Sequence, residues 1–183
     1  MSVTLITGIQ AAGKSTVAQR LAERLPRSVH VRGDLFRRMI VNGRSEMGAA
    51  HPPDEAVRQL RLRYQLAAAA ADGYSGAGFN VVLQDIILAD DLLWVIERIR
   101  ARPLSVVVLA PSVAAVTARD LERQRGRGKV AYRQGDQDIA ALDRALRDTT
   151  PRLGLWLDTS ELTVDETVDR ILTAADGEAK PTP

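Results

Sequence analysis

Residues 5–21 read LITGIQAAGKSTVAQRL, and this stretch decides the fold. The apolar run before Gly8 predicts a buried strand, and the apolar residues after Ser15, at helical spacing, predict a helix. Between strand and helix, residues 8–15 match the pattern G-x-x-x-x-G-K-[ST]. In that pattern, small residues let backbone N–H groups converge on phosphate oxygens. The stretch therefore predicts a phosphate-binding loop for a nucleoside triphosphate, and argues against a tight turn that binds nothing.

The phosphate-binding loop assigns a role to each of its polar residues. Lys14 is expected to contact the β- and γ-phosphates, and the Ser15 hydroxyl is expected to bind Mg²⁺. The N-terminus of the following helix adds positive partial charge at the same place. The predicted nucleotide-contacting residues are Gly8, Gln10, Ala11, Ala12, Gly13, Lys14, Ser15 and Thr16.

Composition limits the class of protein. The chain of 183 residues is 45% hydrophobic and 26% charged, which is ordinary for one well-buried soluble domain. No apolar run reaches the roughly 18 residues of a membrane span, and no secretory leader is recognisable, so a cytoplasmic protein is expected. The absence of cysteine excludes disulfides and thiolate chemistry. With only two histidines, a multi-histidine metal centre or a Ser-His-Asp triad is not expected.

Short apolar runs alternate with helical periods along the chain. Strands are expected at residues 3–7, 28–31, 79–83, 104–109 and 154–157. Helices are expected after the phosphate-binding loop, at residues 35–41, from 54 to about 73, at 92–99, from about 112, and after a capping box at Thr163 and Glu166. This alternation predicts one α/β domain over residues 1–176, with a parallel sheet covered on both faces and a frayed tail at 177–183.

Two aspartates follow strands of this expected sheet. Asp34 comes after the second strand in VRGD, and Asp85 ends the third in VVLQD. Ligands of open α/β sheets bind beyond the carboxyl ends of the strands, so both acids are expected beside the phosphates. Asp34 is predicted to accept the proton of an attacking hydroxyl or to hold Mg²⁺ through water, although it could also be an N-cap. Asp85 fits the Walker-B position that acts on the metal, or it simply starts a loop.

Arginine dominates the basic residues, with three lysines among the 25 basic side chains and a net charge of only +2. Genomic composition accounts for most of this bias, but one segment concentrates six basic residues: Arg119, Arg123, Arg125, Arg127, Lys129 and Arg133. We expect residues 119–134 to form a lid, made flexible by Gly126 and Gly128, in which Arg119 and Arg123 close over the phosphates. The alternative is a solvated basic loop.

The acceptor site is expected between the helix at 35–41 and the helix that starts at residue 54. Arg38, Arg61 and Asp85 are the predicted substrate-binding residues there. The guanine-selecting sequence N-K-x-D is absent, which argues against a GTPase. Nucleic acid is not the expected partner, because only Tyr132 lies near the basic segment for base stacking.

Taken together, these motifs resemble the small P-loop kinases related to nucleoside monophosphate, shikimate and gluconate kinases. The order of RGD, VVLQDIIL and LDTSELTVDETVDRI is most similar to chloramphenicol-phosphotransferase-like proteins. The resemblance implies a five-stranded sheet of order 2-3-1-4-5, with helices on both faces and a short arginine-rich lid. It also implies ATP and Mg²⁺ as cofactors, with Asp34 as the base and Arg119 and Arg123 as lid arginines.

The implied reaction moves the γ-phosphoryl group of ATP to a hydroxyl of a small metabolite or antibiotic. Two other functions remain open at this point, an ATP-binding regulatory module with weak ATPase activity and a polynucleotide 5′-hydroxyl kinase. A monomer or a homodimer is expected, with no membrane partner. No residue pattern in the sequence identifies the acceptor molecule.

Overall fold

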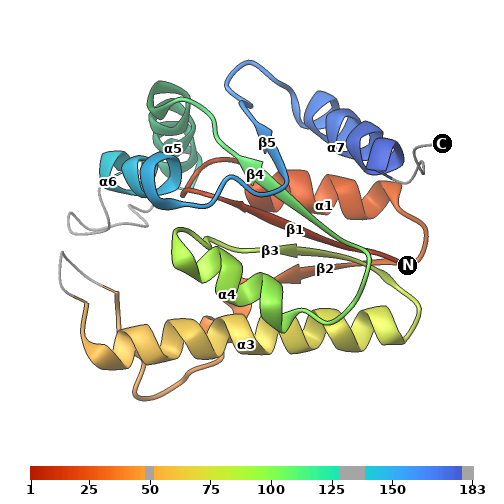
Figure 1. Ribbon diagram of the computed structural model, residues 1–183. Helices are drawn as coiled ribbons and strands as arrows, with labels where there is room; N and C mark the ends of the chain where they lie inside the picture. The colour runs from red at the N-terminus through yellow and green to blue at the C-terminus, as the bar shows by residue number, and fades with distance from the viewer. Residues whose placement is uncertain (48–51, 128–138, 179–183) are drawn as a thin grey trace.

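The fold is built on a five-stranded parallel sheet whose strands lie in the order β2-β3-β1-β4-β5 (Figure 1). The computed structural model describes residues 1–47, 52–127 and 139–178. The strands are β1 (Val3–Gly8), β2 (Ser28–Arg32), β3 (Asn80–Gln84), β4 (Leu104–Leu109) and β5 (Leu155–Leu157). The order and the parallel pairing confirm the predicted fold class.

Helices cover both faces of the sheet. They are α1 (Lys14–Arg24), α2 (Gly33–Arg38), α3 (Asp54–Gly76), α4 (Asp90–Arg98), α5 (Val113–Arg127), α6 (Ile139–Arg144), the π-helix η1 (Ala145–Thr149) and α7 (Val164–Glu178). One apolar cluster joins β1 and β4 to α1, α5, α6 and α7, and a second joins β1 and β3 to α3 and α4. Figure 1 shows α3 and α4 on one side of the strands and α1 and α7 on the other. Because strand side chains alternate between faces, Leu5 belongs to the second cluster and its neighbour Ile6 to the first.

Most element boundaries fall within a few residues of their predicted positions. The capping box is confirmed, since the Thr163 backbone N–H donates to Glu166 Oε2 at 2.8 Å and the Glu166 N–H donates to Thr163 Oγ1 at 3.2 Å. Gly126 lies inside α5, and the flexibility expected of its segment stays a prediction. Helix α7 continues to Glu178, and residues 179–183 of the predicted tail lie outside the described part of the chain. Within the described ranges, no helix is long and apolar enough to span a membrane.

The second helix begins earlier than predicted. Helix α2 starts at Gly33, with Arg32 in the N-cap position and no side-chain cap. Asp34 therefore lies in the first turn of α2, and the N-cap interpretation of this residue is wrong. A carboxylate in a first turn is favourable to the helix without capping it.

The short strand β5 depends on Gly154, which precedes it. This glycine has φ +69°, and a Cβ atom on it would overlap the backbone carbonyl of Val106 in β4. The backbone of residue 154 therefore approaches β4 more closely than any side chain would allow, in a conformation that glycine adopts without strain.

We predict that Gly154→Ala lowers the free energy of unfolding by about 1–3 kcal/mol, because the backbone strain adds to the contact with Val106. Urea unfolding measures the change. Gly73→Ala in α3 is the matched control, since nothing lies within 4 Å of its Cβ position, and alanine there should stabilise the helix by up to about 1 kcal/mol. Equal stability of the two variants would contradict the packing described here.

Candidate functional site

The candidate site is a cleft of about 790 Å³ at the carboxyl ends of the strands. Its floor is the loop between β1 and α1 together with the first turns of α1. On one side it is lined by residues of β2, α2, α3 and the end of β3, and on the other by Arg119 and the segment from Thr159 to Thr167. We call the first side the basic wing, defined by Arg32, Arg37, Arg38 and Arg63 with Asp34 and Asp85, and the second the β5 wing.

The loop at the floor has the tight backbone that the sequence predicts. Ala11 and Gly13 have φ of 57° and 91°. Lys14 is buried, and its Nζ donates a hydrogen bond to the Ile9 carbonyl at 2.7 Å. All the predicted nucleotide-contacting residues line the cleft except one.

The exception is Gly8, which is buried at the end of β1. Its φ is +147°, and a Cβ atom there would overlap the carbonyl of Leu109 in β4. Gly8 thus allows β1 and β4 to lie close together where the loop leaves the sheet, and its contribution to phosphate binding is indirect.

Asp34 lies in the basic wing with one carboxylate oxygen bound and one without a hydrogen bond. Its Oδ2 is 2.7 Å from a terminal nitrogen of Arg38. Its Oδ1 is buried and has no hydrogen-bond partner within the described part of the chain, the Arg32 Nε being 3.9 Å away. An oxygen in that state can accept a proton or a hydrogen bond from a ligand.

Asp85 has a different environment. It is 4% exposed and accepts hydrogen bonds from Arg63 Nε at 2.7 Å, from a terminal nitrogen of Arg63, and from the Ile86 backbone N–H at 2.8 Å. Burial raises the pKa of this carboxyl, and the Arg63 guanidinium opposes that effect. Because both oxygens are engaged by Arg63, Asp85 is not placed to bind Mg²⁺ directly, and its predicted action on the metal stays a prediction.

Sequence reasoning missed Arg63 and placed Arg61 at the acceptor. The structure puts Arg63 in the cleft, whereas Arg61 is exposed and lowers the pKa of Asp91 in α4, which burial raises. Two residues along a helix correspond to about 200° of rotation, so the two arginines point in nearly opposite directions. The buried face of α3, which contains Tyr64 and Ala67, lies about equally far from both positions, so it does not distinguish position 63 from position 61.

On the β5 wing, Arg119 binds backbone rather than a carboxylate. One of its terminal nitrogens donates to the carbonyl of Thr159 at 2.6 Å and to that of Ser160 at 3.3 Å. Thr159 is buried, and its Oγ1 has no hydrogen-bond partner in the part of the chain that is described. Arg119 therefore holds the segment after β5 against the cleft.

The lid is only partly described. Residues 113–127 form α5, but the side chain of Arg123 and residues 128–134 of the predicted lid lie outside the described part of the structure. The proposed roles of Arg123 and of the lid therefore stay predictions.

The residues present fit a magnesium ion bound together with a triphosphate. Ser15 is exposed at the second position of α1 and lines the cleft, as Asp34 does. Among the described residues, no cluster of three or more His, Asp or Glu side chains could hold a metal by itself. This suits Mg²⁺, which is usually held by one or two protein oxygens, substrate phosphates and water.

Comparison with known proteins agrees with this geometry. A family model described as an AAA domain matches residues 3–151. The chain belongs to this family. No curated protein matches the chain.

Solved structures of kinases share the fold at low sequence identity. A sugar kinase from Janibacter sp. HTCC2649 matches with a TM-score of 0.67 and 15% identity, over 96% of this chain and 95% of that one. A gluconokinase from Sinorhizobium meliloti 1021 gives 0.61 and 17%, over 97% and 93%. The tunicamycin resistance protein of Deinococcus radiodurans gives 0.61 and 19%, over 100% and 98%. The predicted likeness to small P-loop kinases is thus confirmed at the level of family and fold.

Gly33 provides a test of how the Asp85–Arg63 pair is built. A Cβ atom at residue 33 would overlap Oδ2 of Asp85, so glycine lets α2 pack directly on the carboxylate. We predict that Gly33→Ala destabilises the protein by about 1–3 kcal/mol, as overpacking of a buried site does. The same substitution should cost less in an Asp85→Ser background, where the obstructing carboxylate is gone. Urea unfolding of the wild type, the two single variants and the double variant measures the coupling free energy between residues 33 and 85. Strictly additive changes in stability would show that Gly33 does not act through its contact with Asp85.

Proposed function

We propose that this protein is an ATP-dependent kinase that transfers the γ-phosphoryl group of ATP to a hydroxyl of a small molecule. The observation that carries the proposal is the placement of Asp34. Asp34 lines the same cleft whose floor is the phosphate-binding loop, and its buried Oδ1 has no hydrogen-bond partner among the described residues. A nucleotide-binding fold alone would need no such acid.

The two wings differ in what they can accept. The β5 wing offers Leu162, Val164 and threonine side chains, which suit the uncharged base and ribose of a nucleotide. The basic wing holds Asp34 and is the natural place for the acceptor. The triphosphate then lies between them, on the loop N–H groups and Lys14.

In the transfer step, the acceptor hydroxyl oxygen forms a bond to the γ-phosphorus while the bond from that phosphorus to the β,γ-bridging oxygen breaks. The hydroxyl proton passes to Asp34 Oδ1, and ADP leaves. Lys14 stabilises the negative charge that develops on the phosphates. Ser15 would hold Mg²⁺, with Asp34 contacting the ion only through water, and the bound ion would supply positive charge that stabilises the phosphates.

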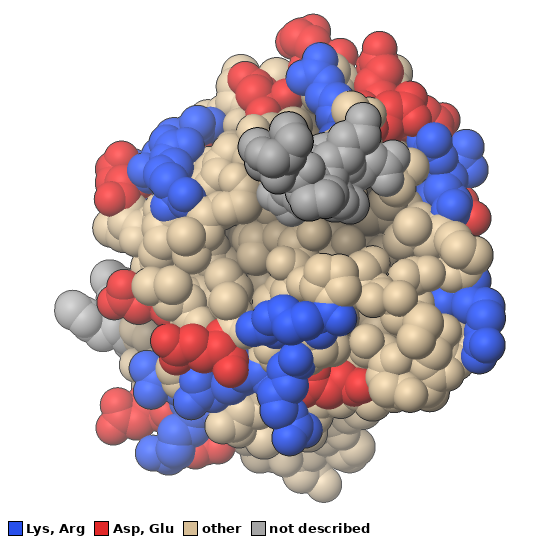
Figure 2. All heavy atoms as spheres, turned by 45° about the vertical axis from the view of Figure 1, so that its right-hand side comes forward, with Lys and Arg blue, Asp and Glu red and all other residues tan. Residues whose placement is uncertain are grey.

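Release of ADP in the presence of candidate acceptors tests the proposal against the two other functions. The panel contains small hydroxylated metabolites, antibiotics and a 5′-hydroxyl oligonucleotide. A kinase releases ADP only with its acceptor, whereas a regulatory module gives a slow, acceptor-independent rate. Figure 2 shows a face on which Lys and Arg side chains are interspersed with Asp and Glu.

We predict that Lys14→Ala lowers acceptor-dependent turnover by about 10²–10³-fold, because it removes a charge that acts on the transferring group. Binding of ATP should weaken as well, and titration calorimetry with a non-hydrolysable ATP analogue measures this. Unchanged turnover and affinity in the purified variant would overturn the assignment of the phosphate-binding loop.

We predict that Asp34→Asn binds ATP normally but loses about 10²-fold or more in turnover, since asparagine keeps the size of the side chain and removes the proton acceptor. The loss should lie at the low end of the 10²–10⁴ range for a general base, because phosphoryl transfer depends more on positioning than on deprotonation. Asp54→Asn, in the first turn of α3 and outside the cleft lining, is the control. Full activity of Asp34→Asn would exclude Asp34 as the base.

A further inference from the structure

The basic wing carries more positive charge than the proposed chemistry requires. It holds the side chains of Arg32, Arg37, Arg38 and Arg63 against those of Asp34 and Asp85. The triphosphate already has Lys14 and the N-terminus of α1 on the floor of the cleft. Three of the four guanidinium groups are paired with Asp34, Asp85 and Glu46, so the excess is one positive charge, and it favours a ligand that is itself negatively charged.

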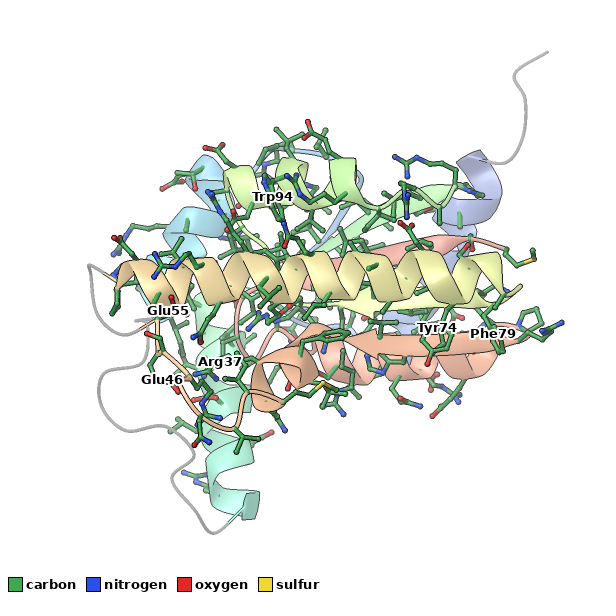
Figure 3. All side chains as sticks on the ribbon, turned by 90° about the horizontal axis from the view of Figure 1, so that it is seen from below. Arg37, Glu46, Glu55, Tyr74, Phe79 and Trp94 are labelled. Carbon is green, nitrogen blue, oxygen red and sulfur yellow. The ribbon has the colours of Figure 1, made fainter. Side chains whose placement is uncertain are left out.

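The four arginines are not equivalent. Arg38 is bound to Asp34, and Arg37 to Glu46 from the segment that follows α2, as Figure 3 shows. The Arg32, Arg37 and Arg38 side chains are 43%, 34% and 66% exposed, whereas that of Arg63 is 13% exposed. Arg63 is the least exposed of the four, so hydrogen bonds from it to a bound anion are the least weakened by water, although the adjacent Asp85 offsets part of its charge.

Arg63 is also held in one orientation. Asp85 accepts hydrogen bonds from Nε and from one terminal nitrogen, along one edge of the guanidinium. Asp85 is itself fixed by the Ile86 N–H and by the packing of Gly33. No described residue accepts a hydrogen bond from the second terminal nitrogen of Arg63. The remaining edge of the guanidinium has two parallel N–H groups, the geometry that binds a carboxylate or a phosphate in bidentate fashion.

Gln84 supplies an independent indication of a polar ligand at the same place. This residue ends β3, immediately before Asp85, and lines the cleft although it is only 4% exposed. Its amide makes no side-chain hydrogen bond to any described residue. The amide atoms of Gln84 are not among the fully buried polar atoms, so they are open to the cleft, where a hydroxyl of a ligand can bind them.

We propose that the acceptor is a small hydroxylated acid whose carboxylate or phosphate group binds the free edge of Arg63 while Gln84 binds one of its hydroxyls. Arg63 is then a specificity-determining residue, and Asp85 is a positioning residue that acts through Arg63. This inference rests on the proposed kinase function, and it excludes neutral sugars, polyols and neutral antibiotics as preferred acceptors.

The first experiment measures binding without turnover. The phosphate-binding loop is saturated with Mg²⁺ and a non-hydrolysable ATP analogue, and matched pairs are then titrated by calorimetry: D-glycerate with glycerol, D-gluconate with sorbitol, and glucose 6-phosphate with glucose. We expect at least one acid to bind tenfold or more tightly than its neutral partner. The carboxylates and the phosphate ester distinguish the two kinds of anion. Failure of every acid to bind better than its partner would overturn the inference.

The second experiment assigns that preference to Arg63. Arg63→Gln alone would leave Asp85 buried without its cation, so the informative variant is the double substitution Arg63→Gln/Asp85→Asn, which removes both charges and keeps two amides that can pair. We expect it to weaken binding of the acid by about 10- to 100-fold and to leave affinity for the ATP analogue and for the neutral partner unchanged. Arg63→Lys keeps the positive charge but loses the two parallel N–H groups, so its affinity for the acid should lie between those of the wild type and the double variant.

Arg58→Gln is the matched control on the same helix, since Arg58 is exposed, pairs with Glu55 and does not line the cleft. It should behave as the wild type. Equal weakening of acid and neutral partner in the double variant would show that Arg63 is only structural. If the 5′-hydroxyl oligonucleotide is the one acceptor in the panel that causes release of ADP, the acceptor is a polynucleotide and not a small acid. Failure to bind the ATP analogue would instead reject the kinase function itself.

Discussion

The close approach of backbone at the end of β1 is the constraint on which the rest of the site depends. Gly8 lies against the carbonyl of Leu109, and the chain then turns through Ala11 and Gly13 at positive φ before α1 begins at Lys14. This turn places the first N–H groups of α1 at the centre of the sheet edge, where β3 and β4 flank β1. The basic wing and the β5 wing are arranged around that point.

The two wings divide the cleft chemically because of the strand order. Strands β2 and β3 lie on one side of β1 and carry Asp34, Asp85 and three of the four arginines close to their carboxyl ends. Strand β5 lies at the other edge; the residues after it that line the cleft are uncharged, and the segment is held by Arg119. A charged acceptor and an uncharged nucleoside can therefore bind on opposite sides of one triphosphate.

Asp34 and Asp85 show how similar sequence positions acquire different chemistry. Both follow strands of the same half of the sheet, yet Asp34 keeps an oxygen without a hydrogen bond, while Asp85 is buried and bound by Arg63. Removing one partner from a buried pair leaves an uncompensated charge, so Asp85 is constrained by stability as well as by its effect on Arg63. Asp34 is paired with Arg38 through Oδ2 only, which leaves Oδ1 as the oxygen that can take a proton.

The sequence by itself determined the order of elements, the phosphate-binding loop and the presence of an acid after β2, because these depend on local periodicity and on a contiguous motif. It could not determine which arginine of α3 enters the cleft, or which aspartate keeps an oxygen without a hydrogen bond to the described residues. Arg63 and Asp85 are 22 residues apart, and their pairing depends on how α3 rotates against the sheet and on the close contact with Gly33. Long-range packing of this kind leaves no mark in a short stretch of sequence, so only the tertiary structure decided that Asp85 holds Arg63 and that Arg61 faces α4.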